Sequence, residues 1–221
     1  MTTYFTHTDY VSNSTLTGFQ ESERCYPPNK DTKKPKIDPE RLKEIFAFGS
    51  LLDAMITEPE RVEATTRTLY DDTGEILTFD VDTYQHSKRL ANSFWDHPLM
   101  RPLCDGIQFQ KEIYRLNFHG GKARCKFDGL HKRLGIGLEI KGLAVSSMKA
   151  LLNSIELLDY DRGAAWYMDL AKIDCMLLAC IRKDGNGVLP FVIKRNDPVY
   201  LSGKIKYLYL LRCYTNWKKR S

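Results

Sequence analysis

The chain has 221 residues, of which 43% are hydrophobic and 28% charged, and its formal net charge is +5. This composition is typical of a soluble globular protein that is long enough to bury a core, and the mildly basic balance permits an anionic partner without requiring one. No run approaches eighteen apolar residues, and the N-terminus MTTYFTHTDY lacks the regions of a secretory signal, so no membrane span or export is expected.

Six cysteines are scattered along the chain without a CxxC pair. Such spacing predicts reduced thiols in a cytoplasmic protein. It also argues against a zinc site and against an iron–sulfur cluster.

The N-terminal third is expected to be an arm followed by helices. Residues 1–38 are polar and turn-rich, which predicts an irregular arm with one short helix near Ser14 to Glu23. A longer helix is expected from Pro39 to Thr57, with Asp38 as its N-cap. Residues 60–79 indicate a loop or small hairpin, and a second helix is predicted from Asp80 to Trp95.

Asp53 lies within the apolar stripe of the helix that begins at Pro39, between Phe46, Gly49 and Ile56 at helical spacing. A buried carboxylate is costly unless it is paired or bound to a metal. The alternative is a carboxylate at the edge of the stripe that reaches solvent. The spacing alone gives the two readings similar weight.

Three strands follow, with a hairpin that starts at Gln108, turns at His119-Gly120-Gly121 and returns over Lys122 to Leu130. The third strand, Leu134 to Lys141, alternates with a period of two. One face is an aliphatic row, made of Leu134, Ile136, Leu138 and Ile140. The other face carries Gly135, Gly137, Glu139 and Lys141.

Asp128 lies near the end of the preceding strand-like run Lys122 to Leu130, so a short turn could bring it beside Glu139. Two carboxylates with a lysine suit a hard divalent cation, which takes oxygen ligands and can activate water. The lysine would then stabilise developing charge. The plainer reading is a solvated ion pair on an exposed strand face, which the spacing alone favours.

In the C-terminal half, the sequence predicts two helices, the first capped by Ser146 or Ser147 and the second over Asp159 to Ala171. Two strands are expected next, at Cys175 to Arg182 and Val188 to Lys194, and an amphipathic helix is expected from Pro198. The buried side of the first of these helices is predicted to consist of Met148, Leu151, Leu152, Ile155 and Leu158. Strands that alternate with helices in this way indicate an α/β domain.

This order of elements resembles the PD-(D/E)XK nuclease superfamily, and within it the RecE-type (exonuclease VIII-like) and lambda-exonuclease-like phage recombination nucleases. Four stretches over residues 40–195 carry the likeness: FGSLLDAMITEPE (48–60), SKRLANSFWDHP (87–98), KEIYRLNFHGGKARCKFDGL (111–130) and LEIKGLAVSSMKALLNSIELLDYDRGAAWYMD (138–169). The resemblance implies an α/β fold with a restriction-endonuclease-like core, a central mixed sheet flanked by helices, and an N-terminal helical extension. It divides the chain into an arm (1–38), a helical part (39–105) and a nuclease-like core (106–221), within one compact domain.

The resemblance also implies roles for individual residues. Asp128 and Glu139 would be catalytic metal ligands, with the carbonyl of Ile140, and Lys141 would be the catalytic lysine. Asp53 falls where related exonucleases often place a histidine ligand, and an aspartate suits Mg²⁺ or Mn²⁺ equally.

Substrate contacts are implied as well. Tyr167 matches the tyrosine of the Gln-x-x-x-Tyr helix, whereas the glutamine position falls on Gly163, so a contact to substrate or catalytic groups would be missing. Glu112 matches an acidic position of the hairpin strand and is a lesser candidate for the site. Apart from the resemblance, charge and position make Arg162 and Lys149 candidate phosphate-binding side chains, and Arg162 is preferred because it can grip phosphate bidentately beside the Gly163–Tyr167 helix. Further basic side chains could steer the DNA backbone, namely Lys88, Arg89, Lys132 and Arg133.

The function expected from the resemblance is a Mg²⁺- or Mn²⁺-dependent DNA exonuclease in phage-type recombination or DNA processing. DNA would be its partner, joined by a single-strand annealing protein, and the chain would assemble as a homo-oligomeric ring. The alternative is a nucleic-acid-binding protein that retains the fold without catalysis. A structural or interaction protein with an incidental acidic pair is the third reading.

Overall fold

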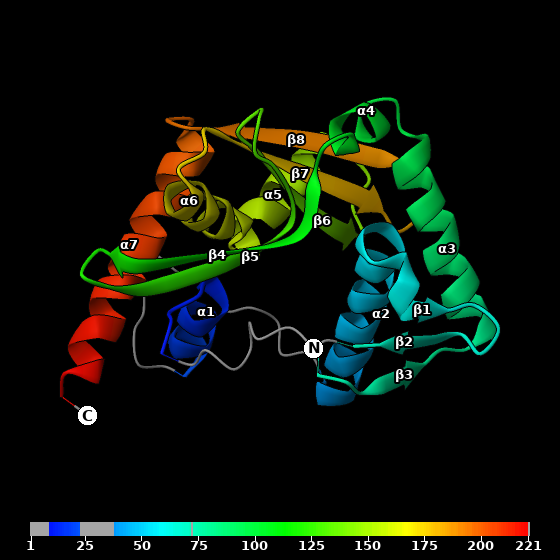
Figure 1. Ribbon diagram of the computed structural model, residues 1–221, viewed down its shortest axis with the longest axis horizontal. Coiled ribbons are helices and arrows are strands. Elements are labelled where there is room, and N and C mark those ends of the chain that lie inside the picture. Colours follow the sequence, from blue (N-terminus) through cyan, green and yellow to red (C-terminus); the bar gives the residue numbers. More distant parts are fainter. Residues whose placement is uncertain (1–8, 23–37, 72, 221) are drawn as a thin grey trace.

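The computed structural model describes residues 9–22, 38–71 and 73–220, and its helices and strands alternate along the chain (Figure 1). The elements are, in order, α1 (Asn13–Glu21), α2 (Pro39–Thr57), the 3-10 turn η2 (Pro59–Arg61), β1 (Val62–Glu63), β2 (Thr68–Tyr70), β3 (Ile76–Thr78), α3 (Val81–Asp96), α4 (Met100–Cys104), β4 (Gln108–Phe118), β5 (Gly121–His131), β6 (Ile136–Leu143), α5 (Met148–Leu157), α6 (Tyr160–Ala171), β7 (Cys175–Arg182), β8 (Val188–Lys194) and α7 (Pro198–Lys218).

The main sheet has five strands in the order β4-β5-β6-β7-β8. Only the β6–β7 pair is parallel, and the three other pairs are antiparallel. The predicted fold, a mixed sheet flanked by helices, is therefore confirmed. A separate antiparallel sheet of β1, β2 and β3 occupies the region that was expected to be a loop or small hairpin.

The helix starts follow the local capping chemistry. Asp38 accepts a hydrogen bond from the backbone of Arg41 at the start of α2, and Asp80 does the same for Thr83 at the start of α3. These contacts satisfy backbone N–H groups that a helix cannot pair internally. The predicted helix at Pro39–Thr57 is confirmed, and the short N-terminal helix is confirmed as α1. The rest of the predicted arm, residues 1–8 and 23–37, lies outside the described residues.

Helices cover both faces of the main sheet. On one face, α2 and α3 pack on Leu138 and Ile140 of β6 and on the apolar side chains of β7. On the other, α6 and α7 pack on Phe127 of β5, while α5 packs on Leu178 of β7. The alternation of β6 therefore fixes which face each functional side chain meets. The prediction that Leu134 belongs to the aliphatic row was wrong, because Leu134 lies before β6 and is 54% exposed.

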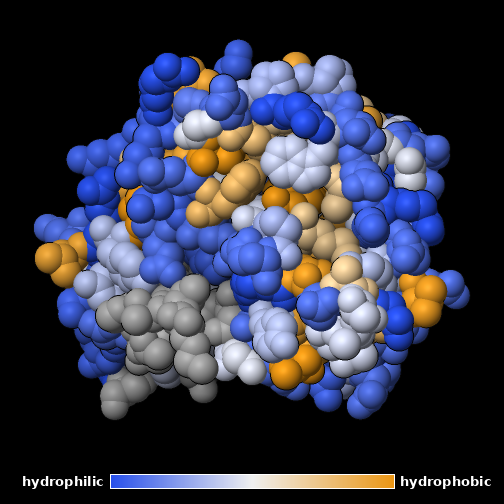
Figure 2. All heavy atoms as spheres, turned by 45° about the vertical axis from the view of Figure 1, so that its right-hand side comes forward, coloured by the Kyte–Doolittle hydropathy of each residue, from blue (hydrophilic) through white to orange (hydrophobic). Residues whose placement is uncertain are grey.

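The prediction for α5 was wrong at three positions. Leu151 and Ile155 are buried, but Met148, Leu152 and Leu158 are each about 40% exposed. The buried side of α5 is therefore narrower than predicted, because Leu151 and Ile155 alone of these five side chains pack in the cluster with Leu178 and Cys180 of β7, whereas Leu158 lines the pocket described below. Figure 2 shows one face of the molecule, where hydrophilic side chains dominate the periphery and apolar ones gather nearer the centre.

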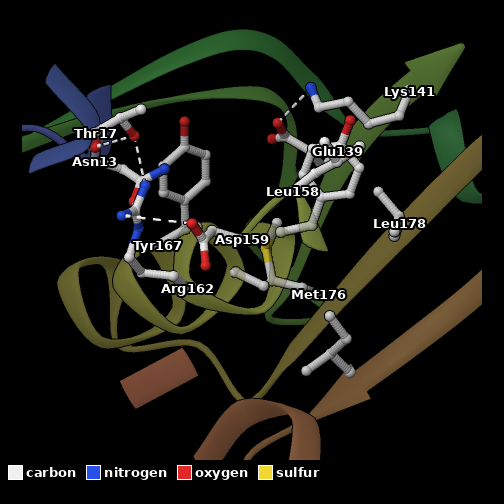
Figure 3. Close-up of a pocket in the computed structure, with 14 residues that line it drawn as sticks. Asn13, Thr17, Glu139, Lys141, Leu158, Asp159, Arg162, Tyr167, Met176 and Leu178 are labelled. Atoms are coloured by element: carbon white, nitrogen blue, oxygen red, sulfur yellow. Dashed lines mark hydrogen bonds and ion pairs between the residues drawn. The ribbon is translucent and has the colours of Figure 1, made fainter. Parts of the chain in front are cut away.

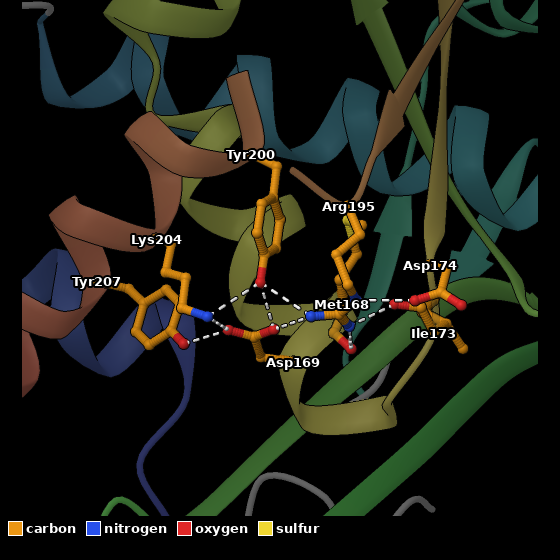
Figure 4. Close-up of polar contacts among 8 residues, drawn as sticks. All are labelled: Met168, Asp169, Ile173, Asp174, Arg195, Tyr200, Lys204 and Tyr207. Atoms are coloured by element: carbon orange, nitrogen blue, oxygen red, sulfur yellow. Dashed lines mark hydrogen bonds and ion pairs between the residues drawn. The ribbon is translucent and has the colours of Figure 1, made fainter. Parts of the chain in front are cut away.

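The C-terminal helix α7 crosses α6 at very close range. A Cβ built on Gly203 would lie 2.0 Å from the backbone oxygen of Asp161, so only glycine allows this approach. Asp169 of α6 joins the two helices further along (Figure 4), where it accepts hydrogen bonds from the hydroxyls of Tyr200 and Tyr207. Arg195, just after β8, forms a 2.7 Å ion pair with the same carboxylate.

Within the described ranges, no helix is both long enough and apolar enough to cross a membrane.

Candidate active site

The centre of the candidate site is the point where β5 and β6 separate. The two strands pair only as far as Gly129 opposite Leu138. Just beyond, the carboxylate of Asp128 replaces a strand partner by accepting a 2.6 Å hydrogen bond from the backbone amide of Ile140. Because the N–H and C=O of one strand residue point toward the same edge, the carbonyl of Ile140 also faces this opening.

Glu139 and Lys141 lie beside that opening on one face of β6, as the alternation predicted. The Nζ atom of Lys141 is 2.6 Å from Oε1 of Glu139 and 4.0 Å from Oδ2 of Asp128. The three side chains are between 18% and 30% exposed, so the ion pair is partly shielded from water. The structure thus brings together one side chain of β5 and two side chains of β6.

Asp53 reaches the same site from α2. Its Oδ2 atom accepts a 2.9 Å hydrogen bond from the side-chain amide of Gln110, which also donates to the hydroxyl of Thr57 at 2.8 Å. Gln110 was missed by sequence reasoning, because a glutamine within an amphipathic strand carries no distinguishing signal. Its backbone has a φ of 49°, a conformation that L-residues adopt uncommonly and that interrupts the β4 strand geometry.

The electrostatics of this group are unbalanced. Burial, and next the charge of Asp128, hold the pKa of Asp53 well above its usual range, although Lys141 partly offsets them. The same two causes raise the pKa of Glu139 to about 7. Burial alone would lower the pKa of Lys141, but attraction by Glu139 and Asp128 outweighs it and raises that pKa. Three carboxylates face one ammonium, so the group attracts further positive charge.

The donor chemistry fits a divalent cation. The Oδ1 atom of Asp53 and the Oε2 atom of Glu139 are buried, and neither has a hydrogen-bond partner among the described residues. Such orphaned carboxylate oxygens, with the Ile140 carbonyl beside them, are the hard oxygen ligands that Mg²⁺ and Mn²⁺ prefer.

The side chains as they lie do not form a ready metal cage. In the part of the chain that the structure describes, no three His, Cys, Asp or Glu side chains are close enough together to hold a metal ion. The ammonium of Lys141, at 2.6 Å from Glu139, instead supplies the positive charge next to that carboxylate. The case for a divalent cation therefore rests on the type of these oxygen atoms and on the two carboxylate oxygens that lack a hydrogen-bond partner among the described residues.

A pocket of about 150 Å³ opens beside Glu139 and Lys141 (Figure 3). Its walls come from β6, β7, α6 and α1, and its lower part is apolar, with Met176 and Leu178. Tyr167 stands between the Glu139–Lys141 pair and a second polar group around Arg162 (Figure 3). The structure thus places Tyr167 in the same pocket as the acidic site.

Arg162 does not have the exposed position that a phosphate-gripping role requires. Its side chain is only 2% exposed, and its guanidinium donates to side chains of α1, including Asn13 and Gln20. Although Arg162 lines the pocket, its hydrogen-bonding capacity is directed into the protein, so the structure assigns it to holding α1. No sequence signal points to this role, because the partners lie more than 140 positions away.

Two other predicted residues do not line this pocket. Lys149 lies exposed in the first turn of α5. Glu112 accepts a 2.9 Å hydrogen bond from the hydroxyl of Tyr114 on the same strand.

Comparison with known proteins finds similarity in solved structures alone. No protein-family model matches the chain, and no curated protein matches it. The crystal structure of a "putative exonuclease" from Eubacterium rectale superposes with a TM-score of 0.59 over 98% of this chain and 87% of that one, at 14% identity. The crystal structure of SSO0001 gives a TM-score of 0.35 at 14% identity, over 89% and 83% of the two chains, which is too low to bear on the fold. The first match shows that the two chains share a fold.

Proposed function

We propose that this chain is a metal-dependent deoxyribonuclease of the PD-(D/E)XK type, and an exonuclease rather than an endonuclease. The observation that carries the proposal is the gathering of Asp128, Glu139 and Lys141 where β5 and β6 separate, with two carboxylate oxygens left without partners nearby. The description of the Eubacterium rectale protein as an exonuclease supports the same reaction class.

The roles of the residues follow from their contacts. Asp128, Glu139, Asp53 and the Ile140 carbonyl would hold Mg²⁺ or Mn²⁺, which when bound supplies Lewis-acid activation of water and of the phosphodiester. Asp128 is fixed by the Ile140 amide, so its second oxygen has a defined direction. Lys141 stays protonated beside two carboxylates and can stabilise negative charge that develops on the phosphoryl group.

The test is digestion of linear, circular and single-stranded DNA with Mg²⁺, Mn²⁺ or EDTA. Lys141→Ala is expected to lower the rate by about 100- to 1000-fold, the usual cost of removing a group that stabilises transition-state charge. Lys122→Ala is the matched control, because Lys122 also forms an ion pair, with Asp9, but on the surface. Its activity should equal that of the wild type.

Each outcome decides something specific. Loss of linear DNA alone, dependent on metal and absent in Lys141→Ala, supports an exonuclease. Cleavage of circular DNA keeps the site but makes the protein an endonuclease. DNA binding without cleavage would favour the non-catalytic alternative, for which the existing Glu139–Lys141 ion pair is the supporting observation.

The finer assignment to RecE-type and lambda-exonuclease-like enzymes rests on the sequence resemblance. It carries the further proposals of a role in phage-type recombination, a ring-shaped homo-oligomer and a single-strand annealing partner. Light scattering of the purified protein tests the ring, since a monomer of 25.6 kDa would contradict it.

A further inference from the structure

The N-terminal helix α1 forms one wall of the candidate active-site pocket, and a buried arginine holds it there. The Nε atom of Arg162 donates to Oδ1 of Asn13 at 3.0 Å, and Nη1 donates to Oε1 of Gln20 at 2.7 Å. A third nitrogen, Nη2, donates to the hydroxyl of Thr17. A side chain that is 2% exposed thus directs three hydrogen bonds at one short helix.

These contacts fix the orientation of the Asn13 amide. A guanidinium has only donors, so the atom that faces Arg162 must be the amide oxygen of Asn13, and the nitrogen Nδ2 must point elsewhere. That nitrogen lies over Gly163, 3.3 Å from where a Cβ would be at that position. The lack of a side chain at Gly163 therefore leaves the space that the Asn13 amide fills.

Of the two α1 side chains that line the pocket, Asn13 and not Thr17 has a donor to offer to a ligand. The hydroxyl of Thr17 donates to the backbone carbonyl of Asn13 at 3.1 Å and accepts from Arg162, so its single proton is already used. Asn13 is also the first residue of α1, at the positive end of the helix dipole, where an anion is favoured.

We propose that Asn13 is a substrate-binding residue whose Nδ2 group donates to a phosphate oxygen of a nucleic-acid strand in the pocket. Asn13 and the Glu139–Lys141 pair line the same pocket, with Tyr167 standing between them (Figure 3). A strand lying across the pocket would meet the ammonium of Lys141 at one point and the amide of Asn13 at another. This inference rests on the proposed function, because it names how the same site holds its substrate.

Asn13→Asp is the discriminating variant. It keeps an oxygen to accept from Arg162, so α1 stays anchored, but it removes the N–H donor. Ser14→Asp is the charge-matched control, since it adds the same charge one residue along the helix at an exposed position that does not line the pocket.

Asn13→Ala removes the donor without adding charge, and Gln20→Ala is its matched control. Gln20 is another α1 partner of Arg162 and does not line the pocket, so Gln20→Ala reports the cost of loosening α1 alone.

Two readouts are taken on every variant. The first is KM and kcat on linear DNA with Mg²⁺, and the second is the Kd of a fluorescent 5′-phosphorylated oligonucleotide in EDTA, measured by anisotropy. We expect both Asn13 variants to raise KM and Kd by about tenfold or more relative to their controls, with kcat changed less. A tenfold change corresponds to about 1.4 kcal/mol, which is close to the lower limit for a hydrogen bond to a charged group.

The outcomes separate this inference from the proposed function. If the wild type cleaves DNA and the Asn13 variants match their controls in KM and Kd, the inference is overturned and the function stands. If the wild type binds without cleaving, the Kd comparison still decides the role of Asn13. If it neither binds nor cleaves, both proposals fail.

Discussion

Gly203 offers a direct test of how closely α6 and α7 must approach. A Cβ at this position would lie 2.0 Å from the backbone oxygen of Asp161 and 2.8 Å from the backbone nitrogen of Arg162, whereas ordinary contacts are 3.4–4 Å. Backbone atoms cannot rotate away as a side chain can, so Gly203→Ala forces the helices apart by more than about 1 Å or bends one of them.

Two opposing terms decide the size of the effect. Alanine within a helix gains about 1 kcal/mol over glycine, whereas overpacking of this kind costs about 1–3 kcal/mol and more when backbone is displaced. We expect the steric cost to exceed the gain, so that Gly203→Ala lowers the free energy of unfolding by about 2 kcal/mol. For a chain of this size, that loss lowers the melting temperature by about 4–8 °C.

The control is Gly49→Ala, because Gly49 lies within α2 and no atom lies within 4 Å of where its Cβ would be. At Gly49 the higher helix propensity of alanine acts without any steric cost, so Gly49→Ala should raise the free energy of unfolding by about 0.5–1 kcal/mol. Urea denaturation followed by far-UV circular dichroism measures both variants. A Gly203→Ala protein as stable as the wild type would refute the reasoning, because it would mean that α7 can shift without loss.

Two further predictions concern charge. Asp53→Asn keeps an acceptor for Gln110 but removes a charge that Asp128 repels, so it should raise the melting temperature by about 2–4 °C. The variant should also show a smaller increase in melting temperature on addition of MgCl₂ or MnCl₂ than the wild type does. An equal increase in both proteins would show that Asp53 is not a metal ligand. Asp169 is partly buried, yet the hydroxyls of Tyr207 and Tyr200 and next Arg195 hold its pKa below the usual value, so its contribution to stability is present above about pH 4 and is lost as the pH falls further. Asp169→Asn should therefore cost about 2 kcal/mol at pH 7 and much less at pH 3 in urea titrations, and an equal cost at both pH values would contradict the ionic origin of the effect.

The local elements were largely predictable because their signals are local. Asp38 and Pro39 mark the start of α2 through capping chemistry that spans four residues. The alternation of Leu138, Glu139, Ile140 and Lys141 likewise follows from strand geometry alone, and the structure places these side chains on the predicted faces.

The candidate site was predictable only in part, because its remaining features depend on distant contacts. Asp53 lies near Asp128 because α2 packs on the sheet. The apolar stripe of α2 predicts that the helix packs on a core, but it does not decide whether Asp53 is buried or reaches solvent. Arg162 was the preferred phosphate-binding side chain, but it is buried against α1, whose residues lie more than 140 positions away. The backbone turn at Gln110 leaves no trace in residue type, so its hydrogen bond to Asp53 could not have been anticipated.

The bond between Asn13 and Arg162 joins residues 149 positions apart. A ribosome adds about 5–20 residues per second, so α1 leaves it on the order of ten seconds before its partner in α6 has been made. During that interval the helix has no buried guanidinium to dock against, and a nine-residue helix in isolation is marginal in water. An unfinished chain therefore lacks one wall of the pocket, which ties completion of the proposed substrate site to the synthesis of the C-terminal half.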